Sequence, residues 1–132
     1  MLKILIAEDD YVSRKVLCKY LSNFGECDVT VDGIETVQAF IMAHESKRPY
    51  DLISLDIMMP KVDGLKALET IREYERKMGL EEDKKCKVII NSALSEDEVS
   101  FELIKTNNDA YITKPFSLES IQKALKELSL IP

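Results

Sequence analysis

The sequence predicts an α/β fold in which helices cover both faces of a five-stranded parallel sheet. Short apolar runs alternate with longer segments whose apolar residues recur at helical spacing, and five such pairs fit into 132 residues. Small polar or acidic residues stand where most of the apolar runs end. Because crossovers between parallel strands are right-handed, this alternation indicates a doubly wound sheet, for which we expect the strand order 2-1-3-4-5.

Three strand and helix pairs precede Gly79. The strands are the mostly apolar runs 2–7, 27–31 and 52–57. The helices are segments in which apolar residues lie three or four positions apart, at 13–23, 34–44 and 65–78. Gly25 stands where a C-cap glycine is expected for the first helix, and Gly79 is expected to end the third. His44 is expected to be an exposed residue at a helix end.

Two further pairs complete the sheet. The strands are expected at 88–90 and 110–113, and the helices at 95–106 and 117–128. Ser95 followed by Glu98 has the spacing of a capping box, and Ser117 with Ser120 begins the last helix. Residues 1–132 are therefore expected to form one domain, since an apolar content of 45% is enough for a single core.

Composition and charge narrow the classes of function. A net charge of −6 argues against a surface that binds nucleic acid, because phosphate backbones require clustered Lys and Arg. The first apolar run ends in the acids 8–10 and is too short for a signal sequence or a membrane span. Cys18, Cys27 and Cys86 are odd in number and widely spaced, which fits neither a disulfide framework nor a zinc site. These features predict a cytoplasmic protein that does not interact with membranes.

Asp56 is the first candidate for a functional residue. It lies near the end of an apolar strand, where a carboxylate loses hydration and needs compensating charges, hydrogen bonds or a metal. In the expected strand order the first and third strands are neighbours, so Glu8 and Asp9 meet Asp56 in one crevice. Repulsion between two carboxylates about 4 Å apart is on the order of 4 kcal/mol at an effective dielectric of about 20. The cluster therefore predicts a bound divalent cation, for which Mg²⁺ is the best match.

Two further residues are expected at the same edge of the sheet. Lys114 follows the fifth strand and Ser92 follows the fourth, and both side chains can bind oxygens of a phosphoryl group on Asp56. Phosphoryl transfer needs mainly an aligned nucleophile and neutralisation of the phosphoryl charge. An ionised carboxylate needs no general base, so the predicted chemistry is phosphoryl transfer to Asp56.

The order and spacing of these residues resemble the receiver domain of bacterial two-component response regulators, and in extent the chain resembles the single-domain members. The matching stretches are 4–10, 51–60 with 63–64, 92–93 and 111–116. The resemblance implies a flavodoxin-like fold. It also implies that Asp56 accepts a phosphoryl group from a phosphohistidine, on a sensor histidine kinase or a phosphotransfer protein.

The resemblance assigns roles to further residues. It implies that Glu8, Asp9, Asp56 and the backbone carbonyl of Met58 hold Mg²⁺, and that Lys114 contacts the phosphoryl group. It implies a cis peptide bond between Lys114 and Pro115, and it makes Ser92 and Tyr111 the switch pair.

A protein of this kind is not an enzyme with a separate substrate. It assists its own phosphorylation and dephosphorylation, and it passes its state by contact to a downstream protein. Met58 and Leu94 are apolar residues two positions beyond Asp56 and Ser92, where a polar side chain could orient water. Slow self-dephosphorylation is therefore expected.

Other functions remain open. An aspartyl-phosphate phosphohydrolase uses the same nucleophile but favours an acid two residues beyond it, where this chain has Met58. A flavin or nucleotide carrier would need a glycine-rich phosphate loop, whereas the first turn here is acidic. An unphosphorylated docking module would not need the acidic set or Lys114. Taken singly, Asp56 could be a structural cap or half of an ion pair, and Tyr111 could be core packing.

Overall fold

The five strands form one parallel sheet in the order β2-β1-β3-β4-β5, as predicted. The computed structural model describes residues 1–57, 59, 61, 63–92 and 109–132. The strands are β1 (Leu2–Ala7), β2 (Gly25–Thr30), β3 (Leu52–Asp56), β4 (Lys87–Ser92) and β5 (Ala110–Thr113). The helices of the described residues are α1 (Tyr11–Leu21), α2 (Gly33–Glu45), α3 (Gly64–Lys77), α5 (Leu118–Glu127) and a 3-10 turn at Glu82–Lys84. The helix expected at 95–106 lies outside the described residues.

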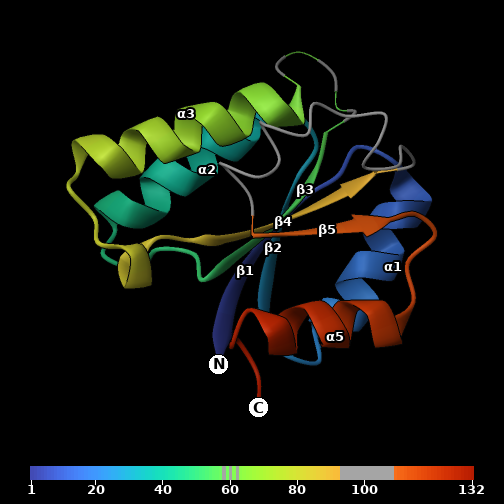
Figure 1. The fold of residues 1–132 in the computed structure, drawn as a ribbon. Coiled ribbons are helices and arrows are strands. Elements are labelled where there is room, and N and C mark those ends of the chain that lie inside the picture. Colours follow the sequence, from blue (N-terminus) through green and yellow to red (C-terminus); the bar gives the residue numbers. More distant parts are fainter. Residues whose placement is uncertain (58, 60, 62, 93–108) are drawn as a thin grey trace.

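The helices cover both faces of the sheet (Figure 1). Helices α2 and α3 lie on one face and α1 and α5 on the other, so each face buries its own apolar cluster. All five residues of β3 are buried, which explains why this central strand reads as an almost continuous apolar run. The sheet is therefore the middle layer of three, and its strand ends are the places where polar side chains can reach solvent.

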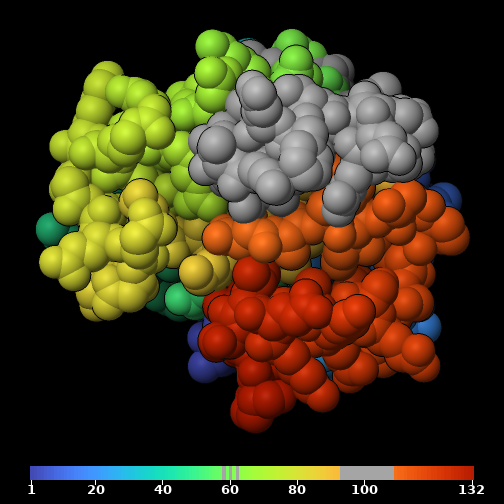
Figure 2. All heavy atoms as spheres, in the orientation of Figure 1, coloured from blue at the N-terminus to red at the C-terminus, as the bar shows by residue number. Residues whose placement is uncertain are grey.

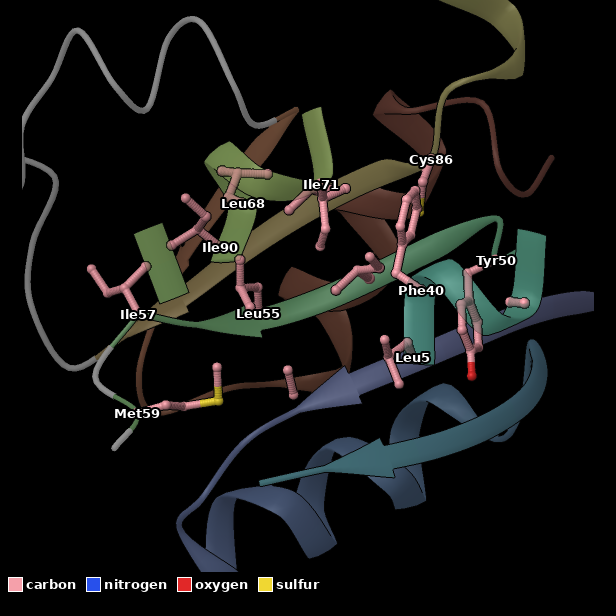
Figure 3. Close-up of a cluster of buried hydrophobic side chains, with 14 residues drawn as sticks. Leu5, Phe40, Tyr50, Leu55, Ile57, Met59, Leu68, Ile71, Cys86 and Ile90 are labelled. Carbon is pink, nitrogen blue, oxygen red and sulfur yellow. The ribbon is translucent and has the colours of Figure 1, made fainter. Parts of the chain in front are cut away.

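The larger cluster lies between the sheet and helices α2 and α3 (Figure 3). Leu55 and Ile90, from neighbouring strands, lie beside Leu68 and Ile71 of α3. Each fully buried aliphatic side chain of this kind contributes about 1.5–3 kcal/mol of transfer free energy. Met59 packs against the same cluster.

Alternation along β1 and β3 divides the side chains between the two faces. Leu5 belongs to the cluster under α2 and α3, whereas Ile4 and Ile6 belong to the cluster under α1 and α5. Ser54 is a buried polar residue of β3. Its hydroxyl accepts a 2.7 Å hydrogen bond from Nδ2 of Asn91 on β4, so these two buried polar side chains are partners inside the sheet.

Acidic or hydroxyl side chains cap the first turns of the four α-helices in the described part of the chain. The N-caps are Asp10, Asp32, Asp63 and Ser117, and each accepts a hydrogen bond from the backbone N–H three residues further on. Because Asp10 supplies such a cap, α1 begins at Tyr11, two residues before the predicted start. Ser117 and Ser120, which were predicted to begin the last helix, form a capping box at its first turn.

Two predictions about single residues were wrong. Gly25 does not cap α1, because Ser22 does so and Gly25 is the first residue of β2. A Cβ at Gly25 would lie 2.2 Å from the carbonyl oxygen of Leu2, so the close approach of two strands requires glycine there. His44 is half-buried rather than exposed, since its ring stacks edge-on against Phe40 at 4.8 Å between centroids.

Gly79 follows the C-cap Met78 with φ of 67°, as expected of a glycine that ends a helix. Strand β4 is longer than predicted and includes Ser92. In Figure 2 the edge strand β5 (orange) and helix α5 (red) lie together on the face toward the viewer. Across the part of the chain that the structure describes, no helix has the length and apolar character needed to cross a membrane.

Candidate functional site

Three carboxylates meet at the carboxyl-terminal edge of the sheet. Glu8 and Asp9 directly follow β1, and Asp56 is the last residue of β3. These strands are neighbours in which Ala7 pairs with Leu55, so the residues that follow reach the same edge. One carboxylate oxygen from each of the three acids lies within 4.8 Å of the other two. The convergence expected from the strand order is therefore present.

The three acids differ in their access to solvent. Glu8 is 0% exposed and Asp56 is 2% exposed, whereas Asp9 is an exposed residue. Two carboxylates thus lie at the bottom of the cluster and the third lies at its mouth. This arrangement leaves an open side through which an ion or a phosphoryl group can approach.

Lys114 brings a positive charge to the cluster. Its Nζ lies 2.8 Å from Oε1 of Glu8 and 3.5 Å from Oδ2 of Asp56. Its backbone N–H donates to the carbonyl oxygen of Ser92 at 2.7 Å, which fixes the turn after β5 against the end of β4. The Lys114–Pro115 peptide bond is cis, as the resemblance implied.

The protonation of the cluster reflects this crowding. Burial raises the pKa of Glu8 from 4.5 to about 7, and the hydrogen bond and negative charge of Asp56 act in the same direction, against the opposing contact with Lys114. Burial lowers the pKa of Lys114, but its hydrogen bond to Glu8 and the charge of Asp56 outweigh that effect, so the pKa is raised overall. The raised pKa of Glu8 therefore reflects its burial first and the neighbouring Asp56 second, and the contact with Lys114 offsets these effects only in part.

The donor set fits a metal site. Carboxylate oxygens are the ligands that Mg²⁺ takes from proteins, and it binds through one or two of them while it keeps several waters. In this cluster Glu8, Asp9 and Asp56 offer such oxygens within 4.8 Å of one another. The negative charge that Lys114 leaves uncompensated is the charge that a divalent cation would neutralise.

The turn after β1 is held by its backbone as well as by its side chains. The N–H of Glu8 donates to the carbonyl oxygen of Thr30 at 3.0 Å, and Oε2 of Glu8 accepts from the N–H of Asp10 at 3.2 Å. Asp10 itself caps α1, and the hydrogen bond from the N–H of Ser13 lowers the pKa of its carboxyl. Asp10 is therefore a helix cap, in line with its omission from the predicted metal ligands.

Ser92 and Tyr111 lie on neighbouring strands near this edge. Ser92 is the last residue of β4 and is fully buried, and it pairs with Thr113 of β5. Tyr111 pairs with Ile90 and is half-buried against the apolar cluster under α2 and α3. The two residues predicted as a switch pair are thus two pairing steps apart along the β4–β5 ladder. Met58 and Leu94 lie outside the described residues.

Sequence reasoning missed three groups around the site. Arg14 donates from Nη1 to the carbonyl oxygens of both Glu8 and Asp9. Lys61, in the loop after β3, lies 3.3 Å from Oδ2 of Asp32, the cap of α2. The pair of Asn91 and Ser54 is the third. In the sequence, the one indication of Arg14 is its position one helical turn after Asp10.

The family model described as response regulator receiver domain matches residues 4–126 of this chain. The chain belongs to this family. Membership places it among the phosphoacceptor domains of two-component signal transduction. It agrees with the fold and with the cluster of Glu8, Asp9, Asp56 and Lys114.

The relatives of the chain include short proteins and much longer ones. It is 33% identical over 131 residues to the chemotaxis protein CheY of Treponema pallidum, an alignment that covers 94% of this chain and 83% of that protein. It is also 33% identical over 120 residues to the peroxide stress-activated histidine kinase mak1 of Schizosaccharomyces pombe, where 89% of this chain corresponds to 7% of the kinase. Receiver domains therefore occur both as most of a protein and as a small part of a kinase.

Among solved structures, the chain is similar to one from the CheX–CheY–BeF3–Mg complex of Borrelia burgdorferi. The TM-score is 0.81 at 25% sequence identity, and the match covers 97% of this chain and 89% of the other. The fold of the receiver domain described here is thus shared by a protein of known structure.

Proposed function

We propose that Asp56 is the phosphoacceptor of this receiver domain. The observation that supports this role best is the group of Glu8, Asp9 and Asp56 with oxygens within 4.8 Å of one another, beside the Nζ of Lys114. Asp56 is the acid of this group that ends the central strand, so it is held rigidly at the open edge of the sheet. A rigidly held carboxylate is the nucleophile that in-line transfer requires.

The transfer itself is a substitution at phosphorus. An oxygen of Asp56 forms the new bond to phosphorus while the bond between phosphorus and the imidazole nitrogen of a phosphohistidine breaks, and the imidazole leaves with the bonding electron pair. An ionised Asp56 needs no base. Lys114 lies close enough to move from the carboxylates to the phosphoryl oxygens without a change in the backbone.

Glu8, Asp9 and Asp56 are the residues that would hold Mg²⁺, together with the backbone carbonyl of Met58 that the family resemblance suggests. When bound, the ion supplies positive charge that offsets the charge on the transferring phosphoryl oxygens. The similar structure from Borrelia burgdorferi is a complex of CheX and CheY with BeF3 and Mg²⁺, which supports the choice of metal. The buried position of Glu8 favours its contribution through a water or a hydrogen bond, and Asp9 is the more accessible ligand.

Ser92 and Tyr111 are the proposed switch residues. The Ser92 hydroxyl is at the end of β4, on the strand next to Asp56, where it can donate to a phosphoryl oxygen. Tyr111 lines a hollow of about 490 Å³ between β5 and α5, so a change in its ring alters a surface that another protein can contact. A partner protein can respond to phosphorylation only if it binds the phosphorylated and unphosphorylated states with different affinity.

The partners follow from the same chemistry. The donor is a phosphohistidine on a sensor histidine kinase or on a phosphotransfer protein, and the receiver of the signal is a downstream protein. Similarity to a histidine kinase over its receiver-like part supports the first assignment. The net charge of −6 favours a protein target over nucleic acid, and we place the protein in the cytoplasm, where two-component kinases phosphorylate their regulators.

Incubation with a small acyl phosphate and Mg²⁺, followed by intact-mass measurement, tests this function. We expect one phosphoryl adduct on the wild type, none on Asp56→Asn, and an undiminished adduct on Asp83→Asn, an exposed acid of the 3-10 turn. An unmodified wild type, or an adduct that survives in Asp56→Asn, contradicts the assignment. Release of many equivalents of phosphate per protein in the same assay would instead indicate an aspartyl-phosphate phosphohydrolase.

A further inference from the structure

Arg14 joins helix α1 to the backbone of the acidic pair. Its Nη1 donates to the carbonyl oxygen of Glu8 at 3.1 Å and to that of Asp9 at 3.3 Å. The guanidinium carbon lies 5.6 Å from the centre of the Tyr11 ring, within the range of a cation–π contact. One side chain on the first turn of the helix thus contacts both residues of the turn that precedes it.

The two acids differ in how much else holds them. Glu8 is fixed by its N–H on Thr30, by the N–H of Asp10 and by the Lys114 ammonium. Asp9 is exposed, and Arg14 donates to its carbonyl oxygen. The same peptide group is also held through the N–H of Asp10, which donates to Oε2 of Glu8. The direction in which the Asp9 carboxylate points depends on the orientation of this backbone, to which Arg14 contributes from the carbonyl side.

On this basis we propose that Arg14 is a positioning residue for the metal site, which acts by holding the backbone of Asp9 in the orientation that a cation requires. The proposal rests on the proposed Mg²⁺ site and goes beyond it, since Arg14 touches neither the ion nor the phosphoryl group. Groups that orient metal ligands typically affect metal affinity by about tenfold or more when they are removed.

The sign of the effect separates positioning from simple electrostatics. Arg14 is a positive charge near the cluster, so its charge alone disfavours a bound cation, and removing it would tighten Mg²⁺ binding. Loss of positioning has the opposite result, because a misdirected carboxylate is a weaker ligand. Lys15 is a matched control, because its Nζ also lies near the Tyr11 ring, at 5.2 Å, whereas the hydrogen bonds to the two carbonyls come from Arg14.

The test is a calorimetric Mg²⁺ titration of wild type, Arg14→Met and Lys15→Met. Methionine keeps an unbranched apolar stem against Tyr11 and removes the charge and the donors. We expect Arg14→Met to raise the Mg²⁺ dissociation constant by about tenfold. Lys15→Met should leave the constant unchanged or lower it slightly. Arg14→Lys, which keeps the charge on a shorter side chain with a single nitrogen, should give an intermediate value.

A second arm asks whether Arg14 acts through Asp9. In an Asp9→Asn background, Arg14→Met should cost much less than it costs in the wild type, because the ligand that it orients has already been weakened. A general loosening of the fold would cost the same in both backgrounds. Far-UV circular dichroism and thermal melts in EDTA check that each variant is folded. If Arg14→Met is not folded, Arg14→Lys takes its place in both arms of the experiment.

The outcomes distinguish this proposal from the one on which it rests. An equal or tighter dissociation constant for a folded Arg14→Met, or equal losses in both backgrounds, overturns the role of Arg14 while the Mg²⁺ site stands. Absence of Mg²⁺ binding by the wild type overturns both.

Discussion

Among the acids of this site, Glu8 is the one whose charged form is strongly disfavoured by burial. Its side chain is fully buried beside Asp56, and that environment raises its pKa from 4.5 to about 7. Lys114 offsets part of the cost through a 2.8 Å ion pair. The pKa could not be predicted from the sequence, because it depends on the distances among three side chains from segments far apart in the chain. The identity of the acid could be predicted, since it follows a buried strand.

The raised pKa predicts a dependence of stability on pH in the metal-free protein. Between the ordinary pKa of 4.5 and the folded value of about 7, the folded protein binds more protons than the unfolded chain, so stability falls as the pH rises through this window. The loss attributable to Glu8 is at most about 3 kcal/mol. Glu8→Gln removes this titration, so the variant should gain stability relative to wild type between pH 5 and pH 8.

Urea denaturation in EDTA at the two pH values measures this gain, and Glu119→Gln, an exposed acid of α5, is the control for which no gain is expected. A difference between Glu8→Gln and wild type that is the same at both pH values contradicts the prediction.

At the scale of elements, helix α3 is attached to the sheet by a buried ionic network as well as by apolar packing. Nη1 of Arg72 lies 2.7 Å from Oε1 of Glu75 and donates to the carbonyl oxygen of Cys86 at 2.8 Å. Oε2 of Glu75 accepts from the N–H of Cys86, and Nη2 of Arg72 lies 3.0 Å from Asp109. The network connects α3 with the residues just before β4 and β5, at the end of the sheet opposite the acidic cluster.

Breaking this network should be costly. Glu75→Gln removes the fully buried carboxylate that pairs with Arg72, whose side chain is 11% exposed and which keeps its ion pair with Asp109. The expected loss is about 3 kcal/mol in the free energy of unfolding. Glu73→Gln breaks the exposed Glu73–Arg76 pair on the same helix and should cost less than about 0.5 kcal/mol. Chemical denaturation of both variants makes the comparison. Similar losses for the two would mean that Glu75 does not stabilise the fold through its buried pair.

At the scale of the whole molecule, one sheet lies between the helices α2 and α3 on one face and α1 and α5 on the other (Figure 1). It separates two apolar clusters, and the acids lie together at the carboxyl ends of its strands. The layers could be predicted, because strand and helix periodicities are local properties of the sequence. The acidic edge faces solvent on one side only, since Glu8 and Asp56 are buried. An ion bound there would be held by the folded chain and not by the unfolded one.

Mg²⁺ should therefore stabilise the whole fold. At about ten times its dissociation constant, a ligand that binds only the folded state adds about 1.4 kcal/mol. For a domain of this size the melting temperature should rise by about 5 °C. Asp56→Asn should reduce the rise, whereas Glu127→Gln, an exposed acid at the end of α5, should not. Melts at constant ionic strength, with K⁺ in place of Mg²⁺, provide the reference, and an equal rise in wild type and Asp56→Asn would speak against this site.

The sequence by itself determined the alternation of strands and helices and the charged residues at the strand ends. With the strand order expected for such a sheet, it also predicted the meeting of Glu8, Asp9, Asp56 and Lys114. The periodicity of each element and the residue type at each strand end are both visible within a few neighbouring positions of the sequence. Parallel strands then bring their carboxyl ends to one edge of the sheet. It also determined the family, through the order and spacing of the same residues.

Only the tertiary structure decided which groups hold these residues in place. The contacts of Arg14 with two carbonyls, of Asn91 with Ser54 and of Arg72 with Asp109 each depend on atoms about 3 Å apart. Asn91 and Ser54, on neighbouring strands, are 37 positions apart in the chain, and so are Arg72 of α3 and Asp109, the residue before β5. Hydrogen bonds weaken steeply with distance and angle, so such partners are selected by the packing of whole elements against one another and not by the pattern of any one segment.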